Sequence, residues 1–364
     1  MKFVITGVHF LVFLAAALGL APPALAQVPD TAATESQEPG SVIVFPKFVR
    51  GTVTVDDRTT AQTEITIAAR CPPDATCREP EQVRIRFRWV CPGSQDIASM
   101  YVCKETGFDL ALSVDGKVKF NPDNLPLPEN ARVSAAPCPQ GYLIGWVTDD
   151  SHRPIKYDGL IGDAILRDRS GAIETYDAIQ IRAEPNLATR AGIASGIDPR
   201  TGAPTLVFDG AAGHYQSVGG QVLAEVKNHI LTYPVSFRNA SLILLTLDVR
   251  ANRPNYPTFV RLDYYNEAEL RASTSWDFLC WAQVQPSEAD SRLSGMRTRN
   301  GVAMSGQAVK TPFAGISDIP GPVTLLGLVK KSDGSPTRKP MDQTYIFNIM
   351  DNSTLIPTVF LPLD

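Results

Sequence analysis

Residues 83–90 place the strongest structural constraint on this chain. Their apolar members alternate strictly with Arg84, Arg86 and Arg88. Successive side chains of a β-strand point to opposite faces, so the alternation predicts a strand with one packed face and one basic, solvated face. From the rise per residue of a strand, the three arginines should lie about 6.6 Å apart along the basic face.

Short segments of similar character recur along the rest of the chain, separated by turns rich in proline and glycine. Between two of them, Asp115-Gly116 predicts a two-residue hairpin turn. Residues 141–147 are apolar on both faces and predict a central strand that is covered on both sides. Residues 222–227 are the one weak helix candidate. Many short strands joined by such turns predict an all-β sandwich or barrel.

The first residues of the chain have the pattern of a signal peptide. Lys2 gives a positive start, an apolar run follows at residues 10–20, and Ala24-Leu25-Ala26 supplies a small-residue cleavage pattern. The predicted organisation is a signal peptide at residues 1–26, a disordered leader at 27–40, a first β-sandwich domain at 41–184, a linker at 185–204 and a second β-sandwich domain at 205–364. No residue-level repeat shows that the two halves are a duplication.

The cysteines point to disulfides. All six follow the predicted cleavage site: Cys71, Cys77, Cys91, Cys103, Cys138 and Cys280. An even number of cysteines in an exported chain predicts disulfide bonds, and hence a secreted or periplasmic location. Cys71–Cys77 and Cys91–Cys103 fit as local pairs, although six cysteines allow other connectivities. The close Cys and His pairs of a zinc site do not occur, so we expect no metal.

Charge and hydropathy exclude two classes of protein. The formal net charge is −4, whereas a nucleic-acid-binding protein is usually clearly basic. The N-terminal apolar run is shorter than the roughly 20 residues that span a bilayer, and no later segment is apolar enough to do so. We therefore expect no nucleic-acid partner and no integral membrane segment after signal cleavage. No cofactor-binding motif is present either, so no cofactor is expected.

Three regions resemble a known kind of protein. Residues 41–48, residues 141–147 with 158–163, and residues 266–281 are similar to uncharacterised secreted bacterial immunoglobulin-like β-sandwich proteins. The resemblance implies a fold and an exported location, and it carries no activity and no site residues. With it, the predicted fold is all-β, with two immunoglobulin-like β-sandwich halves or one larger sandwich, after a cleaved signal peptide.

The arginine row is the first candidate for a ligand-binding surface. Guanidinium groups bind carboxylate and phosphate through paired hydrogen bonds, so Arg84, Arg86 and Arg88 would suit an anionic polysaccharide or an acidic envelope protein. In the alternative interpretation, the arginine face is exposed to solvent and binds no ligand. Its arginines then pair with acidic residues on neighbouring strands, for which Glu64 is a candidate. A sugar platform of aromatic side chains is a further hypothesis, with Trp281 or Tyr265 as its exposed members.

Catalysis has weaker support in the sequence. Aspartates recur in one glycine-containing region, at Asp158, Asp163, Asp168 and Asp177. A glycosidase needs two carboxylates facing each other across a cleft, whereas acidic residues at hairpin ends are common without catalysis. No catalytic residue is assigned. We expect an exported, non-enzymatic structural, adhesive or binding protein of the cell envelope or exterior; the alternative is an exported polysaccharide hydrolase with a carboxylate-based site.

Overall fold

The described part of this computed structural model is all β and contains no helix, in agreement with the predicted fold class. It comprises residues 38–51, 62–78, 81–93, 103–125, 135–167, 173–197, 202, 204–219, 221–227, 235–236, 240–247, 257–266, 271–285, 297–298, 301–310, 325–331, 344–345 and 347–349. The predicted signal peptide and most of the predicted leader lie outside these residues, as does Asp168.

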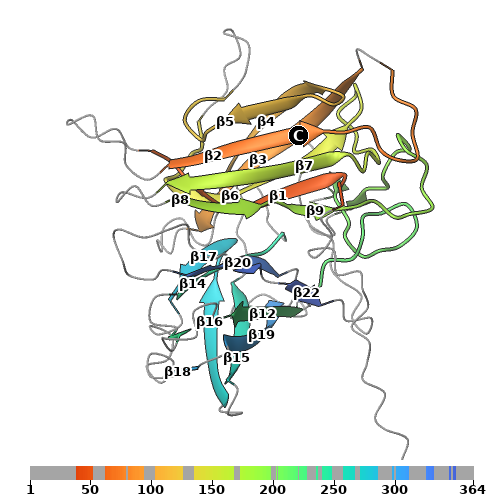
Figure 1. Ribbon diagram of the computed structural model, residues 1–364. Coiled ribbons are helices and arrows are strands. Elements are labelled where there is room, and N and C mark those ends of the chain that lie inside the picture. Colours follow the sequence, from red (N-terminus) through yellow and green to blue (C-terminus); the bar gives the residue numbers. More distant parts are fainter. Residues whose placement is uncertain are drawn as a thin grey trace, which may run out of the picture. The chain divides into compact units, whose positions relative to one another are not determined.

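The arginine-bearing segment forms β3 in a five-stranded antiparallel sheet (Figure 1). In the order of the sheet, its strands are β4 (Cys103–Ser113), β3 (Gln82–Gly93), β6 (Gln140–Thr148), β1 (Val42–Val49) and β9 (Ile179–Ile181). Strand β6 pairs with β3 on one side and with β1 on the other. All its residues after Gln140 are buried, so the prediction of a central covered strand is confirmed.

The first half of the chain also contains a four-stranded sheet (Figure 1). Its strands are β5 (Lys117–Phe120), β2 (Gln62–Ala69), β7 (Leu160–Arg167) and β8 (Ile173–Asp177). The predicted turn at Asp115-Gly116 is present, and the Gly116 N–H donates to the Ser113 carbonyl at 2.8 Å. It is not a hairpin, because β4 pairs with β3 while β5 pairs with β2. The turn therefore carries the chain from one sheet to the other.

The apolar face of β3 contributes to an aromatic cluster in the core. Val83, Ile85, Phe87 and Trp89 are all buried. Phe87 stacks on Phe108 of β4 with ring centroids 5.1 Å apart, and Trp89 meets Phe48 of β1 edge-on at 4.7 Å. Fully burying one such side chain stabilises a fold by about 1.5–3 kcal/mol, so this cluster anchors β3 and sends its arginines to the other face.

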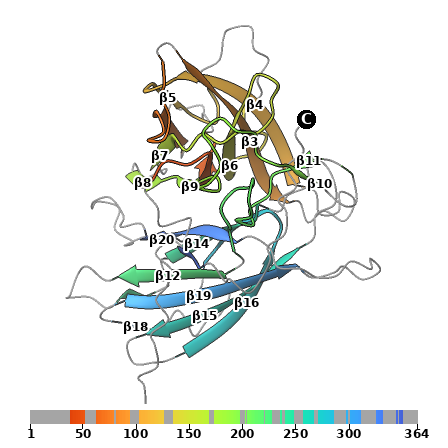
Figure 2. The ribbon, with the colours of Figure 1, turned by 90° about the vertical axis from the view of Figure 1, so that its right-hand side faces the viewer.

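The second half of the chain contributes another five-stranded sheet (Figure 2). In order, its strands are β16 (Arg271–Phe278), β15 (Thr258–Asn266), β19 (Gly301–Lys310), β12 (Gln221–Lys227) and β22 (Phe347–Ile349). The weak helix prediction for residues 222–227 is wrong, because β12 pairs with β19 along its whole length. So short a segment has little helix stability of its own, and strand pairing decides its conformation.

The remaining strands form three smaller sheets. A four-stranded sheet has the order β17 (Trp281–Val284), β14 (Ala240–Leu245), β20 (Leu326–Lys331) and β21 (Thr344–Tyr345). Two-stranded pairs are formed by β10 (Gly196–Ile197) with β11 (Pro204–Thr205), and by β13 (Val235–Ser236) with β18 (Arg297–Thr298). Between β16 and β17 the chain turns at Cys280, whose φ is 61°.

Strand β17 packs against strands of the first half, including β3 and β6. The Trp281 indole Nε1–H donates to the Pro46 carbonyl at 2.8 Å, and the Tyr142 hydroxyl donates to the Thr246 carbonyl at 3.0 Å. Trp281 is only 3% exposed, so its predicted place on an exposed sugar platform is wrong. The reason is this distant packing, which the local sequence pattern does not encode.

Three disulfides are present: Cys71–Cys77, Cys91–Cys138 and Cys103–Cys280. The Cys71–Cys77 pair matches the local pairing expected from the sequence. The expected Cys91–Cys103 pair is wrong, because the β3–β4 register places Cys103 opposite Gly93 rather than Cys91. Cys103 instead pairs with Cys280, 177 residues further along the chain. This bond joins the two halves of the chain beside the β3–β17 contact.

Candidate functional site

The three arginines of β3 differ strongly in exposure. The exposed fraction of the side chain falls from 53% at Arg84 to 24% at Arg86 and 7% at Arg88. Each forms an ion pair with an acidic residue: Arg84 with Asp150 at 2.8 Å, Arg86 with Asp109 at 2.8 Å, and Arg88 with Glu105 at 3.0 Å. The row thus starts at the surface and ends in the interior.

Arg88 and Glu105 form the interior end of the row. The Glu105 side chain is 3% exposed, and the Arg88 guanidinium lies 5.8 Å from the ring centroid of Trp146. Burial raises the pKa of the Glu105 carboxyl, and the Arg88 charge opposes that rise. An ion pair this enclosed has no access to a large ligand, so its role is structural.

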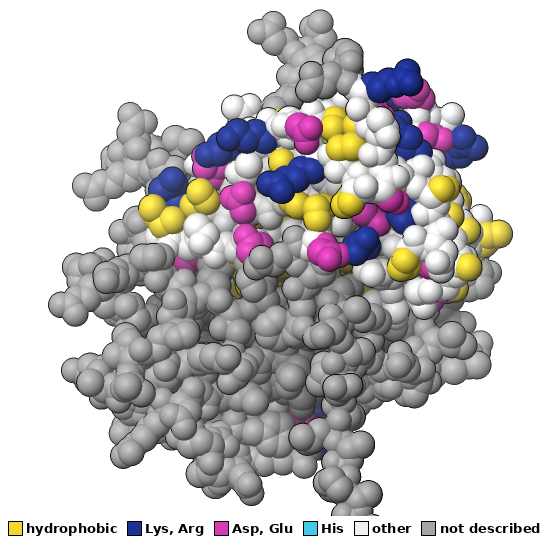
Figure 3. Space-filling view, turned by 45° about the vertical axis from the view of Figure 1, so that its right-hand side comes forward, with side chains coloured by type: hydrophobic (Ala, Val, Ile, Leu, Met, Phe, Trp, Pro, Cys, Tyr) yellow, Lys and Arg dark blue, Asp and Glu magenta, His cyan; other side chains and the backbone are white. Residues whose placement is uncertain are grey.

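Glu64 is not the partner expected for these arginines. It pairs instead with Lys119 of β5, with Nζ and Oε1 2.8 Å apart. The prediction fails because β2, which carries Glu64, belongs to a different sheet from β3. On the face shown in Figure 3, basic and acidic side chains lie interspersed rather than in separate patches.

A cavity of about 220 Å³ lies at the exposed end of the row. Its polar lining includes Arg84, Thr148, Asp149, Asp150, Tyr157 and Arg190. The Tyr157 side chain is buried, and its hydroxyl has no hydrogen-bond partner among the described residues. Burial, with a further contribution from the Asp115 charge, raises the pKa of Tyr157 to about 12. Tyr157 is therefore neutral at ordinary pH and offers both a donor and an acceptor.

The turn at residues 149–153 forms one wall of this cavity. The Asp149 carboxylate accepts hydrogen bonds from the backbone N–H groups of Ser151 and Arg153, at 2.8 and 2.9 Å. Burial acts to raise the pKa of Asp149, but the hydrogen bonds from Arg153 and Ser151 outweigh it and leave that pKa lowered. Asp149 is thus an ionised carboxylate fixed in position by its own turn.

Arg190 reaches the cavity from the loop that precedes β10. Its backbone has a φ of 71°, a left-handed conformation that non-glycine residues seldom adopt. The Arg190 N–H donates to the Lys156 carbonyl at 2.8 Å, and the Lys156 N–H donates to the Ala191 carbonyl at 2.9 Å. The guanidinium also forms an ion pair with Glu81. Paired backbone hydrogen bonds therefore hold this strained residue in place.

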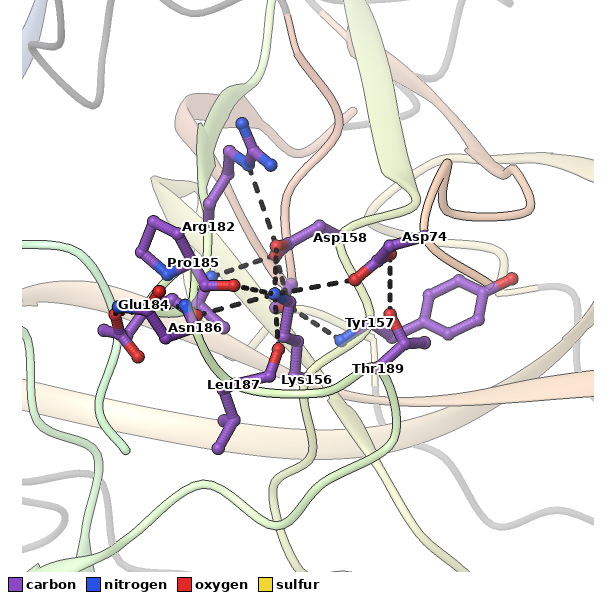
Figure 4. A network of polar contacts seen from close by, with 12 residues as sticks. Asp74, Lys156, Tyr157, Asp158, Arg182, Glu184, Pro185, Asn186, Leu187 and Thr189 are labelled. Carbon is purple, nitrogen blue, oxygen red and sulfur yellow. Dashed lines mark hydrogen bonds and ion pairs between the residues drawn. The ribbon is translucent and has the colours of Figure 1, made fainter. Parts of the chain in front are cut away.

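Lys156 anchors the loop that carries Arg190 (Figure 4). Its side chain is 3% exposed, and its ammonium donates to the carbonyls of Leu187 at 2.7 Å and Pro185 at 3.1 Å. The carboxylates of Asp74 and Asp158 lie 3.7 and 3.9 Å away. An ammonium has three donors, and here they tie together loop carbonyls that would otherwise be buried without partners.

Asp158 completes this network from the segment next to Lys156. It accepts hydrogen bonds from the Ser41 hydroxyl at 2.6 Å and from the Ala183 N–H at 2.9 Å. Burial raises the pKa of the Asp158 carboxyl, against the effect of these hydrogen bonds and of the Arg182 and Lys156 charges. The network thus fixes the start of β1, the end of β9 and the loop that follows β9. Asp158 lies beside the cavity and is not one of its lining residues.

Two of the predicted aspartates face each other elsewhere. Asp163 of β7 and Asp177 of β8 are direct register partners and line a second cavity of about 350 Å³, together with Arg70. Burial raises the pKa of Asp163, the Thr66 hydrogen bond opposes that rise, and the Asp177 charge adds to it. Asp163 is half-buried and Asp177 is exposed. The structure thus brings together two of the four aspartates and places Asp158 in the Lys156 network.

The aromatic side chains do not form the hypothesised sugar platform in the described residues. Trp89, Trp146 and Trp281 are buried, and Trp276 is half-buried. The Tyr265 side chain lies outside the described part of the structure. The described residues also contain no group of three or more His, Cys, Asp or Glu side chains able to hold a metal ion. Within them, no helix is long and apolar enough to span a membrane.

Sequence reasoning identified Arg84 but missed Tyr157, Lys156 and Arg190. Arg190 lies in the predicted linker, where the sequence shows turn residues and little pattern. Comparisons with protein-family models, with curated proteins and with solved structures gave no match to this chain.

Proposed function

We propose that this chain is an exported, non-enzymatic binding protein of the cell envelope or exterior, built from immunoglobulin-like β-sandwich halves. Its ligand is an anionic polysaccharide that binds at the exposed end of the arginine row. Three disulfides support a non-cytoplasmic location, because such bonds persist in oxidising compartments. The signal-peptide pattern of residues 1–26 supports export independently.

One observation carries the proposal: the cavity at Arg84, whose lining combines two arginines with two aspartates. The Arg84–Asp150 ion pair is exposed, with the Asp150 side chain 90% accessible. Such pairs contribute only about 0–1 kcal/mol, so a ligand carboxylate can replace Asp150 at little cost. Arg86 and Arg88 are progressively less accessible. They therefore stabilise the strand and do not contact the ligand.

The test is a binding titration of exported protein with polygalacturonate, using neutral dextran as the reference polymer. We expect binding of polygalacturonate only, weakened by added salt and by Arg84→Ser. Arg86→Ser is the matched control, because Arg86 lies on the same face but does not line the cavity. Equal binding of dextran, or unchanged binding by Arg84→Ser, would contradict the proposal.

The facing pair Asp163 and Asp177 supports a second candidate function, polysaccharide hydrolysis. Glycosidases use two carboxylates about 5–10 Å apart, one of which has a raised pKa, and Asp163 has that property. Reducing-end release from a panel of polysaccharides tests this function, with Asp163→Asn and Asp177→Asn as variants. Product formation by wild type that both variants lose would make the chain a hydrolase and displace the binding proposal.

A further inference from the structure

We propose that the cavity at Arg84 accommodates a single carboxylated sugar unit, a uronate, with its carboxylate held between Arg84 and Arg190. This inference rests on the proposed function and names the unit that the polymer must carry. Arg84 comes from β3, whereas Arg190 comes from the loop that Lys156 anchors. Two arginines from separate elements thus line one small cavity, and each is paired with one partly exposed carboxylate, Asp150 or Glu81, that a ligand oxyanion would replace.

The rest of the lining favours a sugar carboxylate over a phosphate. Asp149 and Asp150 line the same cavity, and a doubly charged phosphate would be repelled by them. A uronate carries one charge, and its hydroxyl groups can donate to these carboxylates. Tyr157 also lines the cavity, while its hydroxyl is itself closed off from solvent.

The size of the cavity limits the ligand to about one unit. At about 220 Å³ it is smaller than the roughly 300–1,000 Å³ of pockets for drug-sized ligands. A polymer would therefore place one residue in the cavity and extend along the surface on either side. The unit that enters the cavity therefore supplies the specificity for the polymer.

Lys156 acts in this site as a positioning residue. Its ammonium holds the carbonyls of Pro185 and Leu187, and its backbone exchanges hydrogen bonds with Arg190 and Ala191. Together these contacts maintain the left-handed backbone of Arg190. Strained residues of this kind persist where their surroundings determine the conformation, and they occur often at binding sites.

The experiment is an NMR titration of the exported protein with sodium glucuronate, glucose and glucose 6-phosphate as separate probes. We expect shifts at the cavity with glucuronate, weaker binding of glucose 6-phosphate and none of glucose. Arg84→Gln and Arg190→Gln should each weaken glucuronate binding by about tenfold or more, because each removes a charged hydrogen-bond donor. Arg86→Gln is the control and should bind as wild type does.

A double-mutant cycle tests the role of Lys156. Lys156→Met should weaken glucuronate binding, and combining it with Arg190→Gln should cause no further loss if Lys156 acts through Arg190. Additive losses would contradict the positioning role. Should Lys156→Met not fold, Lys156→Gln takes its place in the same cycle: its amide keeps donors near the Pro185 and Leu187 carbonyls but has one donor fewer than the ammonium, and the same lack of additivity with Arg190→Gln is expected.

The outcomes separate this inference from the proposed function. Polygalacturonate binding that neither glucuronate nor galacturonate displaces, or that Arg190→Gln leaves unchanged, would contradict the inference alone. Tighter binding of glucose 6-phosphate than of glucuronate would overturn the assignment of a carboxylate. Failure of wild-type protein to bind any anionic polymer would contradict the proposed function itself.

Discussion

The two ends of the arginine row share one sequence pattern but have different surroundings. At one end, Arg88 is enclosed with Glu105 beside Trp146. At the other, Arg84 lies at the rim of a cavity and pairs with the exposed Asp150. Alternation thus specifies a strand and its faces, whereas contacts with distant segments decide which part of a face remains available to a ligand.

The energetic roles of the two ends should differ accordingly. Removing one partner of a buried ion pair leaves an uncompensated charge in the interior, at a cost of about 3–5 kcal/mol. An exposed pair contributes about 0–1 kcal/mol. The buried end should therefore control the stability of the fold, and the exposed end should control binding.

The largest expected effect is at the buried end. Arg88→Met should lower the free energy of unfolding by about 3–5 kcal/mol, because Glu105 would remain buried without its cation. Urea denaturation measures this change. Adding Glu105→Leu should restore most of the loss; a double variant as unstable as the single one would show that the charges are not the cause.

The second largest effect on stability is expected from the long-range disulfide Cys103–Cys280. Replacing Cys103 and Cys280 by alanine should lower the free energy of unfolding by about 2–5 kcal/mol, measured by denaturation under non-reducing conditions. Replacing Cys71 and Cys77 is the matched control. That bond closes a sequence separation of 6 rather than 177, so its removal should cost less. The reverse order would contradict the proposed role of the long-range bond.

The third effect is an opposite dependence on pH at the two ends. Burial raises the pKa of Glu105 above its ordinary 4.5, so this group favours folding below pH 4.5, and that contribution is lost as pH rises through the folded-state pKa. Asp149 has a lowered pKa. It favours folding above its ordinary 3.8, and that contribution is lost as pH falls through the folded-state pKa.

Two amide variants separate these contributions. Glu105→Gln should remove a decline of stability with rising pH, whereas Asp149→Asn should remove a decline with falling pH. Denaturation curves collected across the acid range measure both slopes. If both variants changed the pH dependence of the free energy of unfolding in the same direction, the two ends of the arginine row would not differ as proposed.

The smallest effect on stability is expected at Arg84. Arg84→Gln should change the free energy of unfolding by less than about 1 kcal/mol, because the Arg84–Asp150 pair is exposed. Binding of polygalacturonate should nevertheless fall. Thermal denaturation and a binding titration on the same sample measure the two quantities. A large loss of stability without loss of binding would reverse the roles of the two ends.

The sequence predicted the local part of this account. Alternation at residues 83–90 identified β3, and the apolar run at 141–147 identified the covered strand β6. It did not predict the Cys103–Cys280 bond or the burial of Trp281, because both depend on contacts between residues far apart in the chain. Arg190 was missed for the same reason, since a buried lysine from another segment determines its backbone.

Hydrogen–deuterium exchange can locate the bound polymer on the protein. With polygalacturonate present, we expect slower exchange in residues 149–153 and 187–191, the segments that carry the cavity residues Asp149, Asp150 and Arg190. Residues beside Arg88 and Glu105 should exchange at the same rate with and without the polymer. Protection confined to residues around Asp163 and Asp177 would contradict the account and place the ligand at the carboxylate pair instead.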